Sequence, residues 1–275
     1  MKQLFEDPLK KKDVLRFSAG GLKLEVHPDR QAAGKAAAYA AADAMRRLGQ
    51  SNHDFGIVFA TGASQLDMLS YLTSIPGLPW SLVHGFHLDE YVALDENHPA
   101  SFRRYLRKNL TSRVSISKFA EINGDAADLD AFCAEYAHRL AQSAPQISLL
   151  GIGENGHLAF NDPGEADFHD PKPMKVVTLD GRCRQQQVDE GWFSSWQEVP
   201  QRALTLTIPT IFRIPKLIVT VPDRRKAEAV RGTLYDPISP ACPSTFLRNH
   251  HDATLYLDVD SASLLDADLF LTPRR

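Results

Sequence analysis

Four times in this chain, a short apolar run is followed by polar or glycine residues and then by a helical pattern. This repetition constrains the fold more than any other feature. The four connecting segments are residues 61–64, 88–91, 151–162 and 222–226. Strands that alternate with helices predict an α/β fold, in which a mostly parallel sheet carries helices on both faces. All four segments would then lie at one edge of the sheet, and we expect the chemistry there.

The remaining patterns complete this outline. Apolar runs predict strands at residues 55–60, 80–87, 147–150, 216–221 and 254–258, and extended segments at 174–178 and 203–208. Helical spacing predicts helices at residues 29–48, 101–110, 126–144 and 226–230, and one after residue 64. Residues 1–21 indicate an N-terminal arm, with an edge segment near residues 22–26. Because no Pro-, Gly- or Ser-rich linker divides the rest, residues 22–275 are expected to form a single α/β domain.

Composition narrows the class of protein. The chain has 275 residues, of which 43% are hydrophobic and 24% charged, as is typical of a soluble globular protein. A net charge of -3 argues against nucleic acid or an anionic membrane as the partner. Three cysteines without a CxxC pair favour a reducing compartment. We see neither an apolar run of membrane-spanning length nor the apolar centre of a signal peptide, so we expect a cytoplasmic protein.

Residues 151–162 read Gly-Ile-Gly-Glu-Asn-Gly-His-Leu-Ala-Phe-Asn-Asp. The three glycines predict a tight turn or a close approach of the backbone to another group. His157 could move a proton at neutral pH, and Asp162 could orient it; a structural or solvated histidine is the alternative. The glycine spacing also has the form of a dinucleotide-binding loop. The residues that follow would break the helix which such a loop must open, so we do not adopt that interpretation.

Two other segments could bind an anion. Thr61-Gly-Ala-Ser64 offers backbone N–H groups, hydroxyls and the start of a helix, which suit a phosphate, although an ordinary helix cap is the alternative. Lys226 could reach an anion at the same sheet edge, or it could be a solvated surface lysine.

Asp89 and Glu90 follow a predicted strand. A carboxylate with an apolar strand behind it can have a raised pKa and act as a general base, whereas the alternative is a pair of solvated loop acids. His84 and His87 do not have the spacing of a zinc site, and the chain lacks the Gly-x-Ser-x-Gly motif of a serine nucleophile. A metal is therefore the less favoured interpretation of these residues.

Taken together, these motifs resemble the glucosamine-6-phosphate deaminase (isomerase) family. Residues 151–164, Gly-Ile-Gly-Glu-Asn-Gly-His-Leu-Ala-Phe-Asn-Asp-Pro-Gly, are similar to one family signature. Leu-Asp-Glu-Tyr-Val at 88–92, with His-Pro-Ala-Ser-Phe at 98–102, is similar to a second. Residues 61–64 resemble the family's phosphate loop, and residues 199–205 and 226–230 follow in the same order. The resemblance covers roughly residues 25 to 265.

The resemblance implies a Rossmann-like fold and an aldose–ketose isomerisation coupled to deamination, in which glucosamine 6-phosphate and water give fructose 6-phosphate and ammonia. Asp89 would shuttle a proton between C2 and C1, and His157 would protonate the ring oxygen, flanked by Asp162 and Asn155. The implied substrate- and phosphate-binding residues are Thr61, Gly62, Ala63, Ser64, Gly153, Arg184 and Lys226. The resemblance implies neither a metal nor an organic cofactor. The partner would be a small sugar phosphate, and the sequence leaves a homo-oligomer open.

Three positions depart from the family pattern. Asn155 and Asp162 stand where many members have Asp and Glu. An arginine that helps to bind phosphate has no clear counterpart: Asp189 or a neighbour falls at its place, with Arg182 and Arg184 nearby. Residues 165–171 also lack the usual continuation, so we predict no activation by an amino-sugar phosphate. A 6-phosphogluconolactonase and a sugar-phosphate sensor without turnover are the alternative functions.

Overall fold

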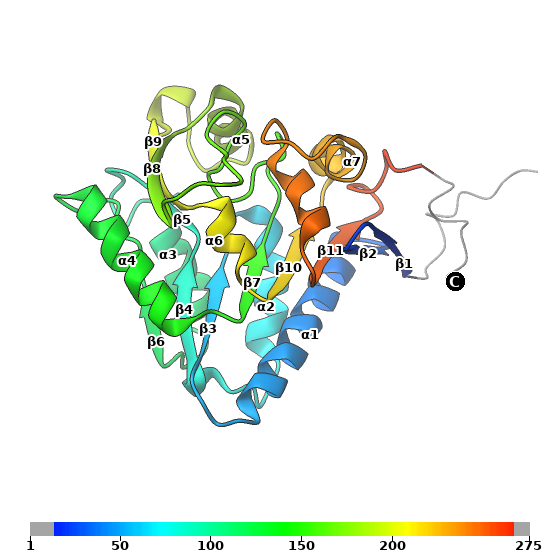
Figure 1. Cartoon of the computed structure of the whole chain (residues 1–275), viewed down its shortest axis with the longest axis horizontal. Coiled ribbons are helices and arrows are strands. Elements are labelled where there is room, and N and C mark those ends of the chain that lie inside the picture. The colour runs from blue at the N-terminus through cyan, green and yellow to red at the C-terminus, as the bar shows by residue number, and fades with distance from the viewer. Residues whose placement is uncertain (1–13, 267–275) are drawn as a thin grey trace, which may run out of the picture.

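The fold is built on one large sheet, seen in a computed structural model that describes residues 14–266 (Figure 1). Eight strands lie in the order β1-β2-β11-β10-β7-β3-β4-β6. Every pair is parallel except β1–β2, so the mostly parallel sheet is confirmed. The strands are β1 Leu15–Ala19, β2 Leu22–His27, β3 Phe55–Phe59, β4 Val83–His87, β6 Lys118–Ala120, β7 Ile147–Leu150, β10 Lys216–Val221 and β11 Ala253–Asp258.

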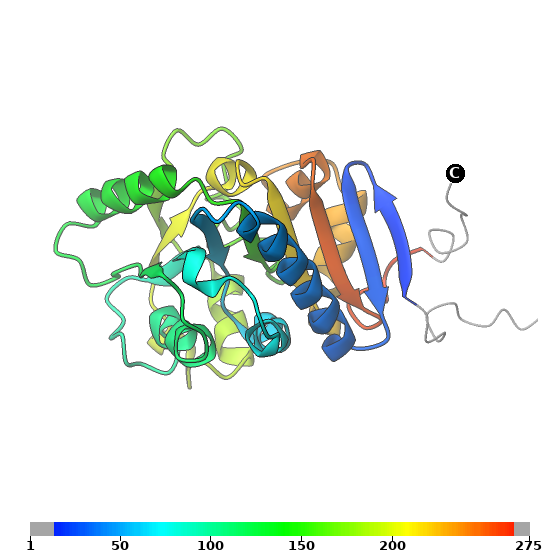
Figure 2. The same ribbon diagram turned by 90° about the horizontal axis from the view of Figure 1, so that it is seen from below.

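Helices cover both faces of this sheet, as predicted (Figure 2). The α-helices are α1 Arg30–Gly49, α2 Leu66–Ser74, α3 Phe102–Leu106, α4 Leu129–Ser143, α5 Gly181–Asp189, α6 Ile208–Phe212 and α7 Ala227–Tyr235. Helices α1 and α2 pack in one hydrophobic cluster, and α4, α6 and α7 contribute to another on the opposite face. Asp29 caps α1 by accepting a 2.8 Å hydrogen bond from the Ala32 N–H.

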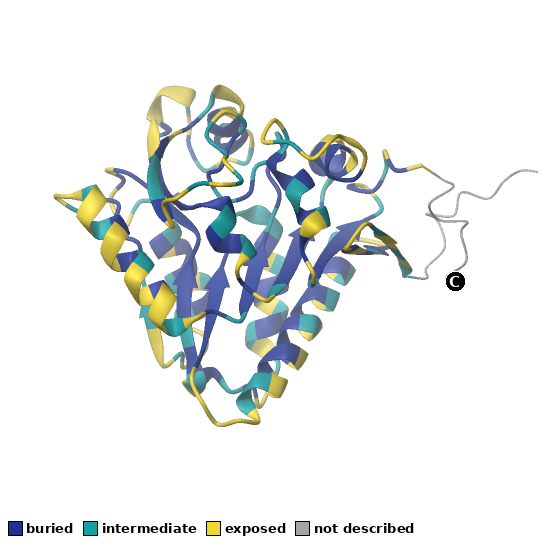
Figure 3. Cartoon of the chain, viewed as in Figure 1, coloured by how far each residue is buried: buried dark blue, intermediate teal, exposed yellow. Residues whose placement is uncertain are grey.

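The burial of the central strands explains why continuous apolar runs in the sequence predicted them. All residues of β3 and β7 are buried, because each strand has neighbours on both sides and helices above and below. Figure 3 shows this as a continuous buried band that the half-exposed helices enclose. The chain leaves β3 toward β4 but leaves β7 toward β10, so the direction of winding changes between β3 and β7. Ligands of open α/β sheets bind at such a point.

A second, antiparallel sheet lies beyond this edge and was not predicted. Its strands are β5 Asp89–Tyr91, β9 Arg202–Leu206 and β8 Met174–Thr178, in that order. The extended segments expected at residues 174–178 and 203–208 are confirmed in part, since the chain turns into α6 at Ile208. Residues 89–91, expected in a connecting segment, form a strand because Asp89 pairs with Thr205.

The N-terminal boundary also differs from the expectation. Residues 15–19, assigned to an arm, form strand β1 and pair with β2 from Leu15↔Val26 to Ala19↔Leu22. Gly20 supplies the positive φ of 61° in the turn between the two strands. Residues 1–13 of the expected arm lie outside the described residues. Within residues 14–266, no helix has the length and apolar character needed to cross a bilayer.

Candidate active site

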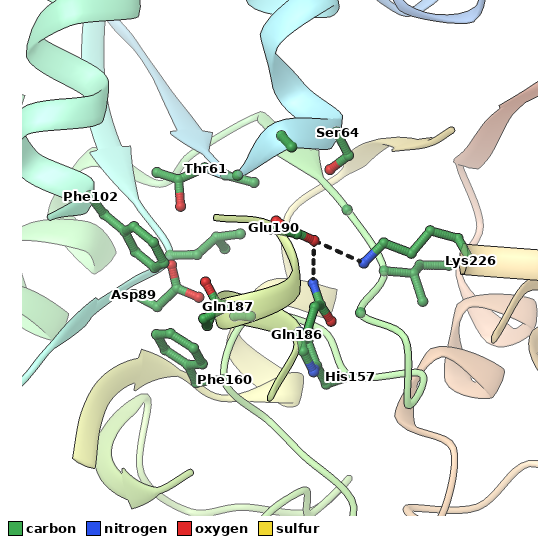
Figure 4. A pocket seen from close by; sticks show the side chains of 18 residues that line it. Thr61, Ser64, Asp89, Phe102, His157, Phe160, Gln186, Gln187, Glu190 and Lys226 are labelled. Atoms are coloured by element: carbon green, nitrogen blue, oxygen red, sulfur yellow. Dashed lines mark hydrogen bonds and ion pairs between the residues drawn. The ribbon is translucent and has the colours of Figure 1, made fainter. Parts of the chain in front are cut away.

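The four connecting segments meet in one pocket (Figure 4). Strands β4, β3, β7 and β10 are consecutive neighbours in the sheet, and the chain that follows each of them lines this pocket. The lining residues from these segments include Thr61, Ser64, Asp89, Gly153, His157 and Lys226. The predicted convergence at one sheet edge is therefore what the structure contains.

Asp89 and Glu90 face different surroundings because successive residues of a strand point to opposite sides. The Asp89 carboxylate faces the pocket, next to the rings of Phe102 and Phe160 (Figure 4). Burial raises the pKa of Asp89 well above its usual value, and the nearby charge of Glu90 adds to this effect. A buried carboxylate with a raised pKa is a stronger base than a solvated one, and this is what proton abstraction from carbon requires.

Glu90 is fully buried on the other side of β5 and is tied to the start of α3. Its carboxylate accepts hydrogen bonds from the backbone N–H groups of Tyr91, Phe102 and Arg103, at 2.9, 3.2 and 2.9 Å. It also pairs with the Arg103 guanidinium at 3.3 Å. Glu90 therefore holds β5 and α3 together, and Asp89 is the carboxylate of the pair that lines the pocket.

The loop after β3 is fixed to the sheet edge by buried hydrogen bonds. Gly62 has a φ of 96°, a conformation that L side chains rarely adopt, and its carbonyl accepts a 2.9 Å hydrogen bond from the Tyr105 hydroxyl. The amide of Gln65 donates to the carbonyls of Leu150 and Thr220, at 3.1 and 3.3 Å, at the ends of β7 and β10. Thr61, Gly62, Ala63 and Ser64 all line the pocket. The loop leads through a short 3-10 turn into α2, so its backbone has the form of a helix start, which is suited to an anion.

His157 lies directly against Gly153. A Cβ atom on Gly153 would stand 2.2 Å from both Nε2 and Cε1 of the imidazole, which no real Cβ can do. The Gly153 N–H also donates to the His157 carbonyl at 3.0 Å, closing the loop on itself. The glycine at this position is therefore required by the close approach of the ring.

Asp162 lies behind His157 and is fully buried. Its Oδ1 is 2.9 Å from His157 Nδ1, a contact that is an ion pair when the imidazole is protonated. Burial alone would raise the pKa of Asp162, but the charge and contact of His157, the Asn155 amide and the Asp180 N–H together lower it. Asp162 is therefore ionised and turned toward the imidazole.

The structure gives a reason for asparagine at position 155. The side-chain amide of Asn155 donates to the carboxylates of Asp162 and Asp180, at 3.0 and 3.2 Å. Its oxygen accepts a 3.1 Å hydrogen bond from the backbone N–H of His157. An ionised aspartate at this position would place a third negative charge beside two carboxylates and could donate a hydrogen bond to neither. Asn155 and Asp162 thus flank His157 from behind and do not line the pocket.

The sequence did not predict that residues of α5 and its C-terminal end line the pocket. Gln186, Gln187 and Glu190 line the pocket, and Glu190 lies beside Lys226 with 3.8 Å between Oε1 and Nζ. Burial lowers the pKa of the Lys226 ammonium, although the charge of Glu190 opposes this. Two features of the sequence could have indicated this helix and its polar face. Asp180 is a helix-capping residue, and positions 186, 187 and 190 share one helical face. The face is polar because it borders the pocket, so it lacks apolar periodicity.

Arg184 does not line this pocket, contrary to the expectation. Its guanidinium lies 3.6 Å from the ring centre of Trp196 and donates to the carbonyls of Trp196 and Val199, both at 2.8 Å. These contacts hold the segment after α5 against the helix. The structure therefore does not place Arg184 where it could replace a phosphate-binding arginine.

Three potential metal ligands, His157, Asp162 and Cys183, lie within 4.8 Å of one another and form the one such group in residues 14–266. Asp162 already contacts His157 and Asn155, and burial raises the pKa of the Cys183 thiol, which disfavours the thiolate that a metal needs. A reaction without a metal stays a prediction.

Comparison with known proteins identifies related sequences. A family model described as glucosamine-6-phosphate isomerases/6-phosphogluconolactonase matches residues 28–256. A glucosamine-6-phosphate deaminase of Listeria monocytogenes is 36% identical over 179 residues, which are 65% of this chain and 74% of that protein. One from Thermoanaerobacter sp. is 32% identical over 217 residues, which are 76% of this chain and 84% of that protein.

Solved structures give the same result. A monomeric glucosamine-6-phosphate deaminase is 30% identical with a TM-score of 0.81, over 88% of this chain and 99% of that chain. A 6-phosphogluconolactonase from Thermotoga maritima is 19% identical with a TM-score of 0.68, over 86% of this chain and 98% of that chain. At that identity, the lactonase shows the shared fold alone.

Proposed function

Because this chain belongs to the family of glucosamine-6-phosphate isomerases and 6-phosphogluconolactonases, we propose that it converts glucosamine 6-phosphate and water to fructose 6-phosphate and ammonia. One observation carries the proposal: a buried carboxylate of raised pKa, Asp89, shares a pocket with His157, the loop at residues 61–64 and Lys226. Isomerisation needs one base and one proton donor, and a phosphate gives binding energy away from the reacting carbons.

In the first step, the substrate enters with its phosphate toward residues 61–64 and Lys226. The backbone at the start of α2 and the ammonium supply the positive potential there. His157, held from behind by Asp162, protonates the ring oxygen as the C1–O5 bond breaks. The C1 hydroxyl releases its proton to solvent, and the pyranose opens to the aldehyde. Asp162 stabilises the imidazolium form that is ready to donate.

In the second step, Asp89 removes the proton from C2 and returns it to C1. The electrons of the C2–H bond form the C1=C2 double bond while the aldehyde oxygen takes a proton that the ammonium gives up, which yields an enolamine. Protonation at C1 then leaves an iminium group at C2. Water adds to this iminium group, and ammonia departs to give the C2 ketone. Atoms balance, because one water enters and one ammonia leaves for each sugar.

An assay with two substrates tests the reaction class. Purified protein is given glucosamine 6-phosphate and, separately, 6-phosphogluconolactone, and ammonia and lactone hydrolysis are measured. We expect ammonia and fructose 6-phosphate from the first substrate. Lactone hydrolysis without ammonia would assign the protein to the lactonase branch. Thermal stabilisation by sugar phosphates with turnover of neither substrate would assign it to the sensor alternative.

The setting of the reaction follows from the same proposal. The partner is a small sugar phosphate, and the proposed compartment is the cytoplasm, in keeping with the free thiols of Cys133, Cys183 and Cys242. Light scattering distinguishes a homo-oligomer, which the sequence allows, from the 30.6 kDa monomer.

A further inference from the structure

A carboxylate stands at the cationic end of the pocket. Glu190 lies at the end of α5, and its side chain is 7% exposed. In Figure 4 it lies in the middle of the pocket view, with Lys226 on one side and Thr61 and Ser64 above it. Within residues 14–266, the Lys226 ammonium has no ion pair with any other carboxylate.

Glu190 is held in this place from two sides. Its Oε1 accepts a 2.8 Å hydrogen bond from Gln186 Nε2, and its Oε2 accepts a 3.1 Å hydrogen bond from Trp192 Nε1. The Trp192 indole packs edge-on against Tyr105, the residue that fixes Gly62. The carboxylate is therefore tied to the same framework that forms the loop at residues 61–64.

The position of Glu190 affects how a phosphate can bind in the pocket. The charged side chains that line it are those of Asp89, Glu190 and Lys226, with His157 as a further titratable group. Lys226 is thus the one basic side chain of Lys or Arg among these lining residues that a phosphate could meet, and Glu190 already pairs with it at 3.8 Å. A phosphate dianion that reaches Lys226 must approach a carboxylate or displace it, and like charges at close range in a buried site repel strongly.

We propose that Glu190 is a specificity-determining residue that competes with the substrate's phosphate for Lys226 and so lowers the preference of the pocket for phosphorylated over unphosphorylated amino sugars. This inference rests on the proposed function, because it concerns the far end of the same substrate. An uncharged hydroxyl in this place can hydrogen-bond with both Glu190 and Lys226. A phosphate gains Lys226 only by losing the Glu190–Lys226 pair.

The test is Glu190→Gln, which removes the charge and leaves an oxygen to accept from Trp192. The values of kcat and KM are measured for glucosamine 6-phosphate and for glucosamine. We expect KM for glucosamine 6-phosphate to fall roughly tenfold or more with kcat nearly unchanged, while the values for glucosamine change little. An unchanged or raised KM for glucosamine 6-phosphate would overturn the inference.

Asp189→Asn is the matched control. Asp189 precedes Glu190 and carries the same charge, but it is exposed, pairs with Gln185 and does not line the pocket. This variant should leave both KM values unchanged. If it lowered the KM for glucosamine 6-phosphate as much as Glu190→Gln does, the effect would be long-range and the inference would be wrong.

A second readout does not depend on turnover. Inorganic phosphate is titrated into the wild-type protein and into Glu190→Gln, and binding is followed by calorimetry. Tighter phosphate binding by Glu190→Gln is expected, and equal binding would contradict the competition. Absence of ammonia release from either amino sugar in both proteins would refute the proposed function, whereas the phosphate titration would still decide the role of Glu190.

Discussion

The imidazole of His157 rests on the backbone of Gly153 so closely that a methyl group there would stand 2.2 Å from Nε2. The contact fixes the ring near Nε2 and Cε1, while the Oδ1 of Asp162 lies 2.9 Å from Nδ1. His157 is thus positioned by the close approach of the Gly153 backbone and by the Asp162 carboxylate. The position of the proton donor in the proposed reaction depends on both.

Gly153→Ala should therefore displace His157 and lower turnover without unfolding the protein. A shift of about 1 Å in a catalytic group can cost roughly 10²-fold in rate, so we expect a loss of that order in kcat. Steady-state ammonia release measures it. Gly181→Ala is the control, because a Cβ there meets nothing within 4 Å. If Gly153→Ala kept wild-type turnover, the ring would not need this contact.

The raised pKa of Asp89 predicts the acid side of the pH profile. A base acts only when it is ionised, so kcat/KM should rise with pH as Asp89 loses its proton, with a midpoint above the ordinary aspartate value of 3.8. Rates measured across the acidic range test this. A midpoint at or below 3.8 would mean that Asp89 is not the base.

The same shift predicts a stability difference with a definite sign. Burial raises the pKa of Asp89 in the folded state above its value in the unfolded state. The contribution of Asp89 to the free energy of unfolding is therefore complete below the unfolded-state pKa, and it is lost as the pH rises through the folded-state pKa. Asp89→Asn carries no such charge. Urea denaturation should therefore show the variant gaining stability relative to the wild type as pH increases.

Glu90→Gln should affect folding rather than chemistry. The substitution puts an amide donor among three backbone N–H donors and leaves Arg103 without its fully buried partner. Breaking one side of a buried pair costs about 3–5 kcal/mol of unfolding free energy, and urea denaturation measures it. Asp125→Asn removes the other, half-exposed partner of Arg103 and should cost less than about 1 kcal/mol. Equal losses in the two variants would contradict the structural role of Glu90.

His157→Gln tests ring opening. It should lower kcat/KM for the cyclic substrate by roughly 10²–10⁴-fold, because a general acid is lost. An analogue that lacks the C5 hydroxyl cannot form the pyranose, and it should lose much less in C2 proton exchange. His84→Gln, outside the pocket, is the control. Equal losses on both compounds would argue against a role in ring opening.

The sequence predicted the elements whose burial it encodes directly. Strands β3, β7 and β10 are apolar runs because both of their faces are covered, and their shared edge follows from parallel pairing. Strand β1 was missed because its alternating, half-buried pattern is short and depends on β2. The direction in which the Arg184 side chain points could not be predicted, because it depends on the contact with Trp196, which forms only when the chain folds. Glu190 was missed because a polar helical face that borders a pocket has the same composition as one that faces water.

The central claim is that Asp89 removes the C2 proton of the amino sugar. Glucosamine 6-phosphate carrying deuterium at C2 is incubated with the wild type and with Asp89→Asn, and the label is followed by NMR together with ammonia release. We expect the wild type to remove the label from C2 and release ammonia. The variant should bind the sugar, keep the label at C2 and release ammonia at least roughly 10²-fold more slowly. Loss of the C2 label by Asp89→Asn at the wild-type rate would contradict the account.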